Sequence, residues 1–147
     1  KGKPSNNVKS NVINREVLFG NFLRLYLTDE RLVNYLKNPV YQLVLGRMND
    51  LATVDISQIE KKDLPATENA DQIRGQIVPF LDNQLPGIIQ ALPQYFSDTI
   101  PRRNIGTLPY SIINFRTPVQ SNLNCYRDMI KGKTVDVYMH SLTFEDD

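Results

Sequence analysis

The first half of the chain carries apolar residues at helical spacing. Between residues 12 and 27 these positions form one broad stripe, made of Ile13, Val17, Leu18, Phe22, Leu25 and Tyr26. The spacing predicts a helix over residues 12–27, with Gly20 at a close crossing of two helices. Because Phe19, Leu23 and Leu27 fall partly outside the stripe, we expect this helix to be central rather than peripheral.

Capping residues punctuate the next segment. Thr28 fits the N-cap of a short helix over residues 29–37, since its hydroxyl can accept a bond from a free N–H of the first turn. Asn38-Pro39 closes that helix and opens another over residues 39–52, with proline at the first helical position. These tightly connected elements predict a compact helical array.

Prolines break up the middle of the chain. Asp55 can cap a short helix through Lys62, and Thr67 begins a helix that Pro79 should kink or end. Three prolines then recur seven residues apart, each followed by an apolar pair: Pro79, Pro86 and Pro93. We interpret this stretch as a string of short, kinked helices that cover the core.

The C-terminal third mixes strand and helix signals. Residues 99–108 read as a loop, and residues 110–115 favour a strand. A helix is predicted over residues 118–131, where apolar residues recur at steps of four, three and four and Gly132 fits a left-handed cap. Residues 134–144 predict a second strand, which gives a β-α-β-like segment over 109–144.

The expected fold class is therefore mainly α. We expect a compact multi-helix domain with several short proline-punctuated helices and a minor two-stranded β element near the C-terminus. A length of 147 residues suits one domain, which we place at 11–147. Residues 1–10 hold three lysines and one apolar residue, so they are predicted to be a flexible basic tail.

Composition narrows the class of protein. The hydrophobic fraction of 41% and the net charge of +1 fit an ordinary globular domain, and no overall field draws it to nucleic acid. No apolar run is long enough to predict a membrane span. Cys125 is the single cysteine, which favours an intracellular or virion-associated protein. The chain begins at Lys1, as expected of a fragment or of a chain whose signal peptide was removed.

Groups for catalysis are scarce. A Cys-His pair would need Cys125 beside His140, the single histidine, and a buried, inert thiol is the simpler interpretation. No metal-ligand motif or glycine-rich phosphate loop occurs, and Asp128 with Asp136 is only a weak candidate for magnesium. We therefore expect no enzyme activity, no cofactor and no metal.

One short segment has features of a binding site. Arg102, Arg103, Asn104 and Arg116 are the candidate residues, with aromatic neighbours in the sequence. Arginine forks match the geometry of phosphate and carboxylate groups, so this segment could bind nucleic acid or an acidic partner. The other interpretation is an ordinary solvated loop.

The leading functional hypothesis is a non-catalytic protein–protein interaction or assembly module. It would be a structural, adaptor or scaffold domain, plausibly viral or from a mobile element, that binds a protein partner or itself. Its basis is the surplus of apolar residues together with the lack of catalytic groups. The alternative is a nucleic-acid-binding protein that uses the Arg102-Arg103 loop and the lysine-rich tail.

Overall fold

The protein is mainly β. The computed structural model describes residues 21–46, 50–80 and 85–145, and it has 42% strand, with one α-helix in those ranges. The expectation of a mainly α, multi-helix domain is therefore wrong. Over the described ranges, no helix has the length and apolar character needed to cross a membrane.

The single α-helix lies near the N-terminus. Helix α1 (Glu30–Lys37) confirms the helix expected over residues 29–37, although its N-cap is Asp29 rather than Thr28. The Asp29 carboxylate accepts a hydrogen bond of 2.9 Å from the Arg31 N–H. Residues 21–27 have no regular secondary structure, so the described part of the helix expected over 12–27 is not helical, while residues 12–20 lie outside the described residues. The basic tail at 1–10 also lies outside them.

The segment after α1 is a small hairpin rather than a second helix. Strands β1 (Leu43–Val44) and β2 (Leu51–Ala52) pair antiparallel where a helix was expected over 39–52. The chain turns at Gly46, whose φ of 98° ends any helix. Asp55 does cap a helix, as expected, but only the 3₁₀ turn η1 (Ile56–Gln58), which stops short of Lys62.

Strands replace the helices expected between residues 67 and 97. They are β3 (Ala66–Thr67), β4 (Ala70–Ile73), β5 (Ile77–Pro79) and β6 (Ile88–Ser97). The regular proline spacing does not mark short helices, because Pro93 lies within β6, opposite Thr107 of β7 (Asn104–Ile112). The strand expected over 110–115 is confirmed in part, since β7 contains residues 110–112.

The helix expected over residues 118–131 is also wrong. This segment forms β8 (Val119–Ser121) and β9 (Cys125–Ile130), and a tight turn leads to β10 (Lys133–Val137). Lys131 and Gly132 have positive φ angles of 48° and 76°, which is the backbone of a two-residue hairpin turn. The left-handed glycine was anticipated, but it joins two strands instead of capping a helix.

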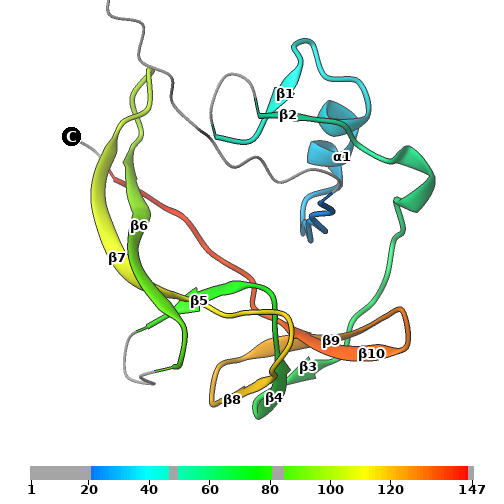
Figure 1. Ribbon diagram of the computed structural model, residues 1–147. Coiled ribbons are helices and arrows are strands. Elements are labelled where there is room, and N and C mark those ends of the chain that lie inside the picture. The colour runs from blue at the N-terminus through cyan, green and yellow to red at the C-terminus, as the bar shows by residue number, and fades with distance from the viewer. Residues whose placement is uncertain (1–20, 47–49, 81–84, 146–147) are drawn as a thin grey trace, which may run out of the picture.

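The sheets are small, and one of them is curled like half a barrel. That sheet has the order β11-β6-β7-β5, and β11 (Thr143–Glu145) pairs parallel with β6. Figure 1 shows β6 and β7 as a long bent ribbon, with the red C-terminal segment running from β10 towards β11. The expected β-α-β unit does not form, because β7 and β10 belong to different sheets.

The core lies where β4, β5 and β9 come together. Its buried residues are Ala70, Ile73, Val78, Leu85, Ile113 and Cys125. Two glutamine side chains also link segments that lie far apart in the sequence. The Gln76 amide donates to the Asp136 carbonyl and accepts from the Tyr138 N–H at 2.8 Å, so it pairs with β10 as a neighbouring strand would. Gln94 accepts from the Tyr110 hydroxyl and donates to the Ser141 carbonyl.

Candidate functional site

Cys125 packs in the core, and His140 contacts the Ile77 carbonyl. Cys125 is 1% exposed in the core, and this burial raises the pKa of its thiol to about 11. His140 follows β10, and its Nε2 lies 2.9 Å from the Ile77 carbonyl oxygen. Its ring also packs against the rings of Tyr110 and Tyr138. A protonated thiol in the core cannot act as a nucleophile at neutral pH.

The described residues offer no metal site of ordinary form, and the hollow beside α1 is small. Among them, no group of three or more His, Cys, Asp or Glu side chains could hold a metal ion. One open hollow of about 200 Å³ lies between the end of α1 and the β1–β2 hairpin, and Leu36, Pro39, Leu43 and Val54 help to line it. It is smaller than the roughly 300–1,000 Å³ typical of ligand pockets.

Arg102 and Arg103 lie in the loop between β6 and β7. The Arg102 guanidinium stacks over the Phe144 ring, 4.5 Å from its centroid. The Arg103 backbone bonds to Ser97 in both directions, by N–H to the hydroxyl and by C=O to the N–H. Asn104 accepts from the Gly106 N–H, so its amide oxygen shapes the start of β7.

Two carboxylates accompany these arginines. Asp98 and Glu145 are exposed residues joined through their backbones, where the Asp98 N–H donates to the Glu145 carbonyl at 3.0 Å. Glu145 follows Phe144, on which Arg102 stacks. The loop therefore carries both signs of charge instead of a purely basic patch.

Arg116 does not join the other three candidate residues. It follows the far end of β7, which is nine residues long and separates it from Arg103. Its N–H donates to the Asn114 side chain at 2.9 Å in a local turn. The four residues proposed from the sequence therefore divide between two ends of one strand.

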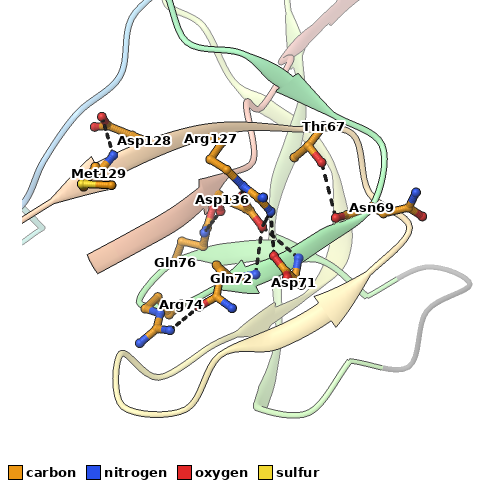
Figure 2. Close-up of polar contacts among 10 residues, drawn as sticks. All are labelled: Thr67, Asn69, Asp71, Gln72, Arg74, Gln76, Arg127, Asp128, Met129 and Asp136. Carbon is orange, nitrogen blue, oxygen red and sulfur yellow. Dashed lines mark hydrogen bonds and ion pairs between the residues drawn. The ribbon is translucent and has the colours of Figure 1, made fainter. Parts of the chain in front are cut away.

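Asp136 holds β4 to β10. From the sequence it was only a weak candidate for a magnesium ligand. Asp136 is fully buried, and Figure 2 shows Arg127 of β9 reaching across to it. Arg127 Nε donates to Asp136 Oδ1 at 2.7 Å, and the N–H groups of Asp71 and Gln72 donate to Oδ2 at 2.8 Å each. Burial alone would raise the pKa of Asp136, but these donors outweigh it and hold the pKa below its usual value.

Asp128 lies at the centre of a second, separate cluster. Figure 2 shows Asp128 on β9 turned away from Asp136, so the two carboxylates do not meet. Asp128 is 5% exposed, and its oxygens accept from the Tyr26 hydroxyl and from Lys62 Nζ, at 2.9 Å each. No sequence signal pointed to this cluster, because Tyr26 lies 102 residues from Asp128 and Lys62 lies 66 residues away.

The largest unexplained feature is apolar surface in the N-terminal segment, which we define as residues 21–59. No described residue from 21 to 69 is buried. Even α1, which is amphipathic, buries none of its residues. Large apolar side chains of this segment are mostly exposed, including Phe22 (96%), Val40 (86%), Tyr41 (84%), Tyr35 (73%), Leu23 (68%) and Leu51 (66%). Exposed apolar side chains that gather into a contiguous patch typically mark a binding surface.

Comparisons with protein-family models, with curated proteins and with solved structures found no match.

Proposed function

We propose that this protein is a non-catalytic assembly module that binds a protein surface through its N-terminal segment. The observation that carries the proposal is the absence of any buried residue in the described part of that segment, although it is rich in leucine, valine and tyrosine. The body from Ala70 onward has its own core, so the segment is not needed to complete that core.

The magnitudes support a binding role. Burying one valine, leucine or aromatic side chain is worth about 1.5–3 kcal/mol. Val40, Tyr41 and Tyr35 together would thus contribute several kcal/mol on a partner, against a total stability of about 5–15 kcal/mol for an ordinary domain. A chain that leaves such residues in water is expected to gain this free energy when it associates with a partner. The gain must exceed the translational, rotational and side-chain entropy that is lost on binding.

The molar mass in solution tests this proposal. We expect light scattering on the full chain to give a mass above the 16.9 kDa monomer that rises with concentration. Val40→Asp with Tyr41→Asp should return the mass to the monomer, whereas Ile88→Asp, at a residue 71% exposed on β6, should not. A monomer at every concentration, or equal effects of both variants, would count against association through the N-terminal segment.

Nucleic-acid binding through Arg102 and Arg103 is a weaker second candidate, because Asp98 and Glu145 accompany the two arginines. Its test is the same measurement with an added oligonucleotide at low and at high salt. A complex that dissociates steeply with salt and is lost in Arg102→Ala with Arg103→Ala would support it. No complex at low salt would exclude it.

A further inference from the structure

The Asp128 carboxylate is buried by residues that come from distant parts of the chain. We call residues 21–28 the strap. Two contacts come from the strap: the Tyr26 hydroxyl at 2.9 Å and Arg24 Nη1 at 3.9 Å. A third comes from Lys62, just before β3, at 2.9 Å. The remaining donor is the N–H of Met129, the next residue along β9.

The strap has no regular secondary structure, and the two contacts it makes with Asp128 fit an extended chain. Arg24 and Tyr26 are two residues apart, yet both reach the same carboxylate. On a helix they would point about 160° apart, whereas in an extended chain they share one side. Leu23, Leu25 and Leu27 then point the other way, and they are 68%, 59% and 41% exposed.

The face of the β9–β10 hairpin that carries Asp128, which the strap contacts, also carries two valines. Val135 stands directly opposite Asp128 in the register of this hairpin, and Val137 stands opposite Tyr126. Residues opposite each other in a strand pair project to the same face, so both valines lie on the face of Asp128. They are 4% and 8% exposed, although neither belongs to the main core cluster. Groups that pack on the Asp128 face must therefore cover them.

We propose that Asp128 is a latch, which docks residues 21–28 as a detachable strap over the Val135–Val137 face of the β body. The strap opens when the carboxylate loses its charge or its partners, and opening exposes the two valines while the main core stays intact. The latch does not depend on the proposed function, because it holds the strap whether or not a partner binds the N-terminal segment.

The charged groups around Asp128 determine the pH range over which the latch stays closed. Arg24, Tyr26 and Lys62 face the carboxylate, and Glu60 contributes a second negative charge 3.4 Å from Lys62. Protonation of Asp128 in acid would leave Arg24 and Lys62 without their shared counter-charge. Ionisation of Tyr26 in strong base would place two negative groups together. Burial and the bond to Asp128 raise the pKa of Tyr26 to about 12, which agrees with a latch that holds over a wide range of pH.

Limited trypsin digestion tests the latch on the full chain. The cut after Arg24 reports strap opening, and the cut after Arg74, which lies between β4 and β5, reports unfolding of the body. In Asp128→Asn we expect the first cut to become about tenfold faster or more, because a hydrogen bond to a charged group is lost, while the second stays unchanged. Asp71→Asn is the matched control, since it removes a 2.6 Å ion pair elsewhere on the body.

Asp128→Asn could unfold the body and accelerate both cuts. A second variant, Tyr26→Phe, distinguishes opening of the strap from unfolding of the body in that case. Tyr26→Phe leaves β9 and β10 untouched and removes only the hydroxyl that bonds to Asp128. Acceleration of the Arg24 cut alone in this variant supports the latch. An Arg24 cut no faster in Tyr26→Phe than in Asp71→Asn would overturn it, as would a cut in the unaltered protein as fast as in an unfolded peptide.

Discussion

Arg127 and Asp136 stand opposite each other on β9 and β10, and their side chains form a two-point ion pair with N–O distances of 2.7 and 3.0 Å. The carboxylate is fully buried, whereas the arginine side chain is 40% exposed. Because Asp136 also accepts hydrogen bonds from two backbone N–H groups of β4, this single side chain joins the β9–β10 hairpin to β4.

Replacing Asp136 with Asn should therefore destabilise the fold strongly. The amide can satisfy the two N–H groups of β4 but then turns its own N–H groups toward Arg127. We expect the free energy of unfolding in urea to fall by about 3 kcal/mol. Asp71→Asn, which removes an exposed partner of the same arginine, should cost less than about 1 kcal/mol. Equal losses in the two variants would contradict the assignment.

Asp128 and Asp136 should make the stability of the protein sensitive to acid. The pKa values of Asp128 and Asp136 are lowered in the folded state, so the unfolded chain binds these protons more readily. The stability they provide is complete above the ordinary carboxyl pKa of 3.8 and is lost as the pH falls through the lower folded values. Urea unfolding between neutral pH and about pH 2 should show this decline, and it should be shallower in Asp136→Asn. An unchanged slope in that variant would argue against the linkage.

Two glycines should respond very differently to alanine. A Cβ on Gly87, where φ is +140°, would lie 2.5 Å from the Ile112 carbonyl oxygen, so backbone must move. Gly87→Ala should cost at least about 3 kcal/mol of unfolding free energy. Gly132 lies in the β9–β10 turn with nothing within 4 Å of such a Cβ, and Gly132→Ala should cost only about 1 kcal/mol for its left-handed backbone. Similar losses at both sites would be inconsistent with the close contact at Gly87.

Cys125 should be unreactive until the protein unfolds. Burial, and to a lesser degree the charge of Asp136, raise the pKa of the thiol from 9.0 to about 11. Because the folded pKa is the higher one, the stability linked to the neutral thiol is complete below pH 9 and is lost as the pH rises towards 11. An aromatic disulfide reagent at neutral pH should label the native protein at the rate of unfolding. Rapid labelling under native conditions would show that the thiol is accessible.

The sequence predicted best where structure is local. Helix α1 was anticipated because its apolar spacing and the Asn38-Pro39 stop lie within a few residues of one another, although the N-cap is Asp29 and not the expected Thr28. The helix expected over 118–131 was wrong because spacings of four and three also arise when short strands are separated by a turn. There the residues that become buried are Ser121, Cys125 and Asp128, and the apolar stripe did not contain them.

The sites were harder to predict than the helix. Tyr26, Lys62 and Asp128 meet only through tertiary folding, and no spacing in the sequence reflects separations of 66 and 102 residues. Arg102 and Arg103 share the loop before β7 and Asn104 begins that strand, as their adjacency implies, but Arg116, which was grouped with them, follows the far end of β7. The nine-residue length of β7 separates them.

The N-terminal segment presents apolar side chains that the folded body does not cover. Binding of a dye that fluoresces in apolar environments, measured on the native chain, tests this most directly. We expect strong fluorescence that falls by more than half in Val40→Asp with Tyr41→Asp, two residues that are 86% and 84% exposed, while urea unfolding of the body stays unchanged. Native protein that does not bind the dye, or binding that the double variant leaves intact, would contradict the account.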